Sequence, residues 1–184
     1  MSNQKKTSQQ KPVQKKGTAI YLKVAAIIVV AAVIIFLAIS NLLKKDETDS
    51  EYMFKKDGTL TFLNDSSQVK AKIDIQIANT EFDRELGLMF RKSMKENQGM
   101  LFIFPVDTLQ TFWMRNTLIP LDMVFINSQK VIVSISRNTK ILSDQTYSSK
   151  GPAQYVLEVN AGYCDKFNIH SGDKVTWKNT LRPI

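Results

Sequence analysis

The chain has 184 residues and a formal net charge of +8, and the excess positive charge sits at one end. Residues 1–45 contain eight of the 25 basic residues and no acidic residue, which leaves 17 basic and 17 acidic residues in the rest of the chain. The body of the protein is therefore formally neutral, which removes the main argument for a nucleic-acid-binding domain. Hydrophobic residues make up 43% of the chain, so wholesale disorder and a disulfide-held scaffold are not expected either.

Residues 20–43 are predicted to form a transmembrane signal-anchor helix. The stretch from Val24 to Leu43 carries no charge and shows no polar stripe. Twenty helical residues span roughly 30 Å, the thickness of the hydrocarbon core of a bilayer. Lysines precede this stretch, whereas acidic residues soon follow it, which predicts a cytoplasmic N-terminus. We therefore expect a single-pass protein of the cell membrane, with its C-terminal domain periplasmic or extracellular.

A cleaved signal peptide is the alternative interpretation of the same stretch. Ala38 and Ser40 are small residues two positions apart, as a signal peptidase site requires. The apolar run is longer than the usual signal core of about 7–15 residues, which favours a retained anchor. Around this helix we expect a disordered, basic cytoplasmic tail over residues 1–19, a charged linker over 44–59 and an exported domain over 60–184.

The first half of the exported domain predicts two strands and a helix. Residues 60–63 suit a short strand. Residues 69–77 alternate apolar and polar side chains, the pattern of a strand with one solvated face. Thr80 is a suitable N-cap, and acidic residues follow it, so a short helix is expected over residues 81–89.

The second half predicts mostly strands. Apolar runs indicate strands over residues 100–104, 111–114, 121–126, 131–136, 155–159 and 174–177. A hairpin turn is expected at 127–130, a long loop at 137–154 and a second short helix at 162–168. The predicted fold class is α+β, mainly β. We expect a single compact sandwich or partly open barrel of six to eight strands with two short helices.

Two carboxylates interrupt strands that otherwise consist of core residues. Asp122 is expected on the same strand face as Val124 and Ile126, and Glu158 lies within the run 155–159. A buried carboxylate must be paired or protonated. Possible partners are Arg84, Arg91, Arg115, Asn116 and Thr117. These residues could form a pocket for acid–base chemistry or a ligand, or a structural network of hydrogen bonds and ion pairs.

No metal site or cofactor is predicted. The single histidine, His170, and the single cysteine, Cys164, have no ligand spacing typical of zinc, and one cysteine excludes an intrachain disulfide. Five methionines could bind Cu(I) in an exported protein, although most lie in apolar runs that suit core packing: Met89, Met94, Met100, Met114 and Met123. Trp113 beside Arg115 could form an aromatic and cationic platform for a ligand.

Several segments together resemble a known family. They are EFDRELGLMFR (81–91), GMLFIF (99–104), FWMRNTLIPLDMVFI (112–126), YVLEVNAG (155–162) and the dipeptide at 172–173. In order and spacing they resemble the domain of unknown function 192 family, over about residues 69–177. The resemblance implies family positions at Arg84, Gly87, Leu88, Met89, Arg91, Trp113, Met114, Asn116, Thr117, Pro120, Asp122, Glu158 and Gly162. Arg115 stands where the family often has lysine. The resemblance implies a compact β-rich domain with short helices and brings no established activity, substrate or cofactor.

Three functions are compatible with these features. The leading expectation is a membrane-anchored, non-catalytic module that binds an envelope component: a glycan, a peptide or a membrane protein. A second is a hydrolase or lyase that uses Asp122 and Glu158 as acid and base and Arg84 to hold an anionic group. A third is copper or redox handling through the methionines and Cys164.

Overall fold

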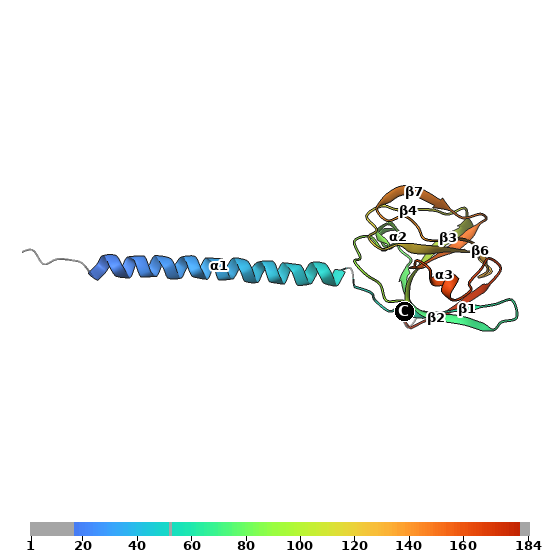
Figure 1. The fold of residues 1–184 in the computed structure, drawn as a ribbon, viewed down its shortest axis with the longest axis horizontal. Helices are drawn as coiled ribbons and strands as arrows, with labels where there is room; N and C mark the ends of the chain where they lie inside the picture. The colour runs from blue at the N-terminus through green and yellow to red at the C-terminus, as the bar shows by residue number, and fades with distance from the viewer. Residues whose placement is uncertain (1–16, 52, 181–184) are drawn as a thin grey trace, which may run out of the picture. The chain divides into compact units, whose positions relative to one another are not determined.

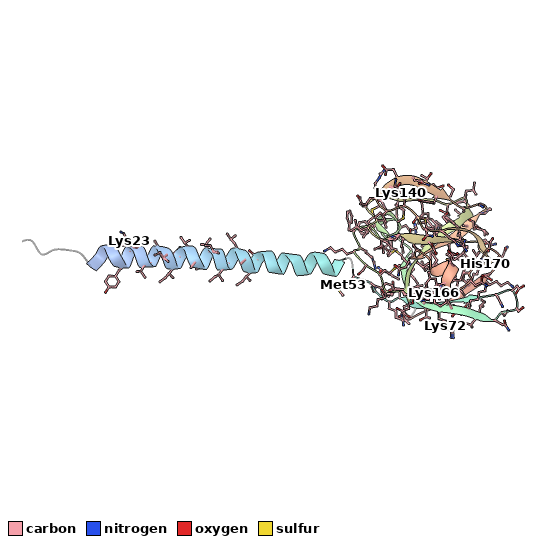
Figure 2. All side chains as sticks on the ribbon, in the orientation of Figure 1. Lys23, Met53, Lys72, Lys140, Lys166 and His170 are labelled. Atoms are coloured by element: carbon pink, nitrogen blue, oxygen red, sulfur yellow. The ribbon has the colours of Figure 1, made fainter. Side chains whose placement is uncertain are left out.

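The structure is a computed structural model that describes residues 17–51 and 53–180, with side chains for residues 21–40 and 53–180. Helix α1, Gly17–Glu51, contains the apolar stretch Tyr21–Ser40. This stretch is long and apolar enough to cross a membrane, and a signal sequence near the N-terminus would have the same length and composition. Its side chains project on both sides of the helix axis in the view of Figure 2. Residues 1–16 of the predicted tail lie outside the described residues. The predicted linker, residues 44–59, begins within α1 and ends two residues inside the first strand, β1 Gly58–Leu63.

The second unit, described over residues 53–180, is built on two sheets. The larger sheet has seven strands in the order β6-β5-β8-β3-β2-β1-β9, and the smaller one pairs β4 with β7. The strands are β1 Gly58–Leu63, β2 Val69–Ala78, β3 Gln98–Thr108, β4 Thr111–Met114, β5 Leu121–Ile126, β6 Ile132–Ser136, β7 Ser143–Ser148, β8 Ala153–Asn160 and β9 Lys174–Asn179. Two short helices complete the unit, α2 Glu81–Leu86 and α3 Tyr163–Lys166. All the pairings are antiparallel except that of β2 with β3.

The seven-stranded sheet is open, and its two outer strands approach one another. An isolated bridge joins Val131, just before β6, to Lys174 at the start of β9. The sheet therefore has an inner face and an outer face, each with its own core. The inner core includes Ile73, Ile75, Leu101, Val124, Leu157 and Cys164. The outer core includes Met100, Phe102, Met114, Met123, Phe125 and Val156. In the described part of the chain this confirms the mainly β fold class, with open sheets and no closed barrel.

The central strands are apolar on both sides because both faces of the sheet are covered. All six residues of β5 are buried, with Met123 and Phe125 in the outer core and Val124 in the inner core. This confirms the faces predicted from the alternation in the sequence. Helix α3 covers the inner face, to which it contributes Tyr163. On the outer face, α2 lies near the two-stranded sheet (Figure 1).

Helix α2 begins as predicted and ends earlier. Thr80 is the N-cap, and its hydroxyl oxygen accepts a hydrogen bond from the backbone N–H of Asp83 at 3.1 Å. The helix ends at Leu86, rather than near residue 89, because Gly87 adopts a φ of 49°. A Cβ at Gly87 would lie 3.2 Å from Cζ of Phe102, so the chain turns tightly against the sheet at this point.

The predicted loop over residues 137–154 was partly wrong, because it contains strand β7. This strand reads SDQTYS, most of it is solvent-exposed, and β4 is its only strand partner among residues 17–51 and 53–180. A strand without an apolar face gives no periodic signal in the sequence. With β7 and the other strands, the described residues contain nine strands rather than six to eight.

Candidate functional site

A small cavity and a wider groove lie beside α2. The cavity, of about 30 Å³, is lined by α2, the residues that follow it, the outer face of the sheet and β4. The groove, of about 420 Å³, is lined by α2, β3 and β4 and the turn between these strands. The cavity and the groove adjoin, because both are lined by Arg84, Glu85, Phe112 and Trp113. A concave site with apolar walls and a few polar groups is the usual form of a ligand site.

Glu158 lines the cavity from strand β8. The sheet register places it between Met100 of β3 and Met123 of β5, both of which belong to the outer core. Its side chain is buried, and within the described part of the chain its carboxyl group forms no hydrogen bond and no ion pair. Burial raises the pKa of Glu158 to about 8, and the positive charge of Arg91 opposes this only in part. The carboxyl group is therefore mostly protonated at neutral pH.

Arg91 is the buried cation that acts on Glu158. Its Nη2 atom donates a hydrogen bond of 2.6 Å to Oε1 of Gln76. Gln76 pairs with Met100, which in turn pairs with Glu158, so Gln76 and Glu158 lie in one row across the outer face. Burial lowers the pKa of Arg91, and the nearby Glu158 raises it by a smaller amount. Arg91 therefore forms its hydrogen bond with the side-chain amide of Gln76, and it acts on Glu158 through its charge alone.

Arg84 lines both the cavity and the groove, but its guanidinium group is already engaged. Its Nη1 atom donates to the backbone oxygens of Asn79 at 2.7 Å and Ile103 at 3.1 Å. The group also lies over the ring of Phe104, with Cζ 5.4 Å from the ring centroid. These contacts attach α2 to the end of the parallel strand pair.

Trp113 is the exposed aromatic residue at the junction of the cavity and the groove. This residue is 44% exposed. Arg115 covers the ring, with Cζ 4.3 Å from the ring centroid, and its Nε atom bonds to Oδ1 of Asp144 at 2.7 Å. The two residues proposed as a platform are therefore in contact, but only Trp113 lines the cavity and the groove.

Asn116 and Thr117 follow β4 and hold this side of the cavity. Asn116 has a φ of 54°, and its carbonyl oxygen accepts a hydrogen bond of 2.9 Å from the N–H of Phe90. This bond fixes the segment after α2 to the end of β4. Thr117 is buried and lines the cavity, and its hydroxyl donates to the carbonyl oxygen of Arg115 at 3.2 Å.

Asp122 does not belong to this site, which corrects the constellation predicted from the sequence. Opposite residues in paired strands share a face, and Asp122 pairs with Val159 while Met123 pairs with Glu158. The two carboxylates therefore lie on opposite faces of the sheet. Asp122 accepts hydrogen bonds of 3.0 Å from the backbone N–H groups of Asn138 and Cys164. A hydrolase or lyase that combines Asp122 and Glu158 in one cleft is not compatible with this geometry.

The residues considered for copper or redox chemistry are also separated. Met100, Met114 and Met123 are buried in the outer core, whereas Cys164 is buried in the inner core. Burial raises the pKa of the Cys164 thiol, so the thiol stays protonated. Within the described residues, no group of three or more His, Cys, Asp or Glu side chains could hold a metal ion.

Several residues that line the groove were not singled out from the sequence. They are Glu81, Glu85, Phe104, Gln110, Thr111 and Phe112. Glu81 and Glu85 are four positions apart in a predicted helix, which places them on one face, and this spacing could have identified them. Gln110 gives no comparable signal, because its burial depends on a hydrogen bond of 3.1 Å to the carbonyl oxygen of Ala153, far along the chain.

Comparison with known proteins agrees with this fold. A family model described as "Uncharacterized ACR", the domain of unknown function 192, matches residues 62–177. UPF0127 protein PF1050 of Pyrococcus furiosus is 27% identical over 124 residues, which cover 65% of this chain and 99% of that protein. UPF0127 protein PH1112 of Pyrococcus horikoshii is 28% identical over 120 residues, which cover 62% of this chain and 96% of that protein.

Two crystal structures are similar as well. One, from Sinorhizobium meliloti 1021, is described as a candidate transcription regulator. It has a TM-score of 0.64 at 32% identity and covers 68% of this chain and 97% of its own. The other, a protein of unknown function from Novosphingobium aromaticivorans, has a TM-score of 0.61 at 33% identity and covers 65% of this chain and 84% of its own. The family match spans more than half of the sequence, and this chain therefore belongs to the domain of unknown function 192 family.

Proposed function

We propose that this protein is a membrane-anchored, extracytoplasmic and non-catalytic module that binds an envelope component in the cavity and the groove. The observation that carries this proposal is Glu158. It is a buried carboxyl group without a hydrogen-bond partner among the described residues, and it lines a cavity that adjoins an open groove.

An unpaired buried carboxyl group lowers the stability of the folded domain. Burial disfavours the charged form of Glu158 and raises its pKa, and an apolar residue between Met100 and Met123 would avoid this desolvation. Such groups collect at functional sites, where strain or desolvation serves binding or catalysis. A ligand that completes the hydrogen bonds of Glu158 would recover this free energy on binding.

The groove provides the remaining surface for a ligand. Phe104, Phe112 and Trp113 supply flat apolar walls, and Gln110 and Thr111 supply polar groups beside them. Aromatic side chains combine a large contact area with few rotatable bonds, so they bind a ligand at low entropic cost. The geometry favours a binding module because Asp122, the second carboxylate of the predicted acid–base pair, lies on the other face of the sheet.

The proposed location rests on α1. The stretch Tyr21–Ser40 is apolar, lysines precede it, and the family match begins only at residue 62. The match to the Pyrococcus furiosus relative covers 99% of that protein and 65% of this chain, and the family match on this chain lies after α1. We propose that it is retained as a single-pass anchor that exports the domain, with its N-terminus in the cytoplasm.

We do not propose DNA binding on the basis of the Sinorhizobium meliloti structure. The part of this chain after residue 45 has equal numbers of basic and acidic residues. A DNA-binding surface normally needs an excess of Lys and Arg to contact phosphates.

Binding can be tested with the full chain in detergent micelles. A thermal-shift screen would compare envelope glycans, short peptides and small amines, because a ligand at 100 times its Kd adds about 2.7 kcal/mol of stability. A ligand of the groove should also change the fluorescence of Trp113. The variant Trp177→Phe removes the other tryptophan, which packs edge-to-face on Tyr155 and contacts Lys130. If no compound shifts the midpoint or the Trp113 signal, the binding proposal fails.

The anchor and its orientation need a separate test. Alkaline phosphatase fused after residue 184 should be active, because the enzyme folds only outside the cytoplasm, and the chain should resist extraction from membranes at high pH. Loss of residues 1–40 from the mature chain would indicate a cleaved signal peptide. An inactive fusion would contradict the proposed orientation.

A further inference from the structure

We propose that the cavity takes the primary ammonium group of an aliphatic amine, which pairs with Glu158 while its alkyl chain lies along the aromatic walls of the groove. This inference rests on the proposed binding function and names the class of ligand. It is argued from the size of the cavity, from the charges around it and from the side chains that form its walls.

The size of the cavity selects a slender group. Its volume of about 30 Å³ exceeds the roughly 10–15 Å³ that a water molecule needs, but it is far too small for a sugar ring. Only a head group of one or two heavy atoms can therefore reach Glu158. The groove, at about 420 Å³, has room for the rest of the ligand.

The charges around the cavity and the groove select a cation. Among the described residues, three carboxyl groups line them, those of Glu81, Glu85 and Glu158, against one cation, Arg84. Arg84 already donates to two backbone oxygens and stacks on Phe104. Arg91 also acts on Glu158, and its guanidinium group is bound to Gln76. When Glu158 is ionised in the complex, the three carboxylates exceed these two cations by one charge, which an ammonium group would balance and an anionic head group would increase.

The walls of the cavity also suit an ammonium group. Phe102, Phe112 and Trp113 line it, and the face of an aromatic ring attracts a cation by about 0.5–2 kcal/mol, most strongly where water is excluded. The carboxyl group of Glu158 has no hydrogen-bond partner within the described part of the chain, so both of its oxygens can accept from N–H groups. A charge-assisted hydrogen bond between ammonium and carboxylate is about twice as strong as a neutral one.

Binding would change the protonation of Glu158. The free carboxyl group is mostly protonated at neutral pH, because burial raises its pKa to about 8. When the ammonium group enters, the carboxyl proton passes to the buffer and the ion pair remains. The other charged groups around Glu158 are Arg84 and Glu85 on α2 and Arg91 after it, and the strand neighbours Met100 and Met123 are uncharged.

Isothermal titration calorimetry of the full chain in micelles tests this proposal with n-butylamine, 1-butanol and butyrate. These three probes have the same chain length and differ in the charge of the head group. We expect binding of the amine alone. Its affinity should rise by about tenfold per pH unit between pH 6 and 7.5, with release of nearly one proton per amine bound. An affinity that is constant over this range, or higher for butanol than for butylamine, would overturn the assignment.

Two matched variants identify the site. Glu158→Gln should weaken butylamine binding by about 30-fold or more, because it removes the charge of the pair and keeps its shape. Glu96→Gln removes an exposed carboxylate that pairs with Lys166 and lies outside the cavity and the groove, and it should bind like the wild type. Thermal midpoints measured in parallel show that both variants are folded. Equal losses in the two variants would overturn the assignment to Glu158.

Further probes distinguish the source of the ammonium group and separate the two proposals. Cadaverine represents free diamines, and Nα-acetyl-lysine methylamide represents the lysine side chain of a peptide. Binding of either one supports the ammonium site, and the tighter binder identifies the source. If a glycan binds in the groove and no amine binds, the ammonium assignment is overturned and the binding function stands. If neither binds, both are overturned.

Discussion

Replacing Glu158 with glutamine should stabilise the unliganded protein at neutral and alkaline pH. Burial raises the pKa of this group from 4.5 to about 8, so between these values the folded chain keeps a proton that the unfolded chain has lost. Stability therefore falls as the pH rises through this window, and the loss is complete above the folded-state pKa. At about 1.4 kcal/mol per pH unit, the wild type loses up to about 3 kcal/mol by pH 7 and up to about 5 kcal/mol by pH 8. Glutamine has no proton to lose.

Urea unfolding of the wild type and Glu158→Gln at pH 5, 6, 7 and 8 would measure this effect, with Glu96→Gln as the control. The stability of Glu96→Gln should depend on pH in the same way as that of the wild type. The stability gain of Glu158→Gln over the wild type should grow as the pH rises. The slope is the quantity to compare, because the buried amide of glutamine adds a term that does not depend on pH. Parallel curves for the wild type and Glu158→Gln would refute the reasoning and indicate that Glu158 is ionised and stabilised by Arg91.

Three further results are expected from residues around the site. Asp122→Ala leaves the backbone N–H groups of Asn138 and Cys164 without their acceptor, so it should lower the free energy of unfolding by about 2–4 kcal/mol. The folded fraction of this variant should bind a groove ligand with unchanged affinity. Gly87→Ala places a Cβ against Phe102 at a positive φ and should cost about 1–3 kcal/mol by urea unfolding, and a neutral result would contradict the tight turn. Cys164 should resist iodoacetamide at pH 8 in the folded chain and react after unfolding, as mass spectrometry would show.

Much of the fold could be predicted from local patterns. The alternation in β2 and the two apolar faces of β5 identified these strands, because side chains in a strand point alternately to its two faces. Thr80 and the acidic residues after it identified the start of α2. Strand β7 could not be found in this way, because its residues are polar and it pairs with the short strand β4.

The site was less predictable, because it depends on register and on contacts between distant segments. A shift of one residue in the pairing of β5 with β8 would place Asp122 and Glu158 on the same face of the sheet. This register cannot be predicted from the sequence patterns of the two strands alone. The burial of Glu158 was predicted. The cavity beside Glu158 was not predicted, because it depends on two contacts between distant segments. Gly87 ends α2 against Phe102, and the carbonyl oxygen of Asn116 accepts a hydrogen bond from the segment after the helix.

The pairing of β1 with β9 bears on how the domain forms during synthesis. Gly58 pairs with Asn179, and the N–H of Thr180 donates to the carbonyl oxygen of Asp57 at 2.8 Å. One edge of β1, the first strand of the domain, is therefore paired with β9, the last strand. A ribosome makes β1 more than a hundred residues before β9, and contacts of such long sequence separation slow folding. Until β9 is available, one edge of β1 remains open to pairing with other chains. The nascent domain is thus exposed to aggregation until its final strand has been made.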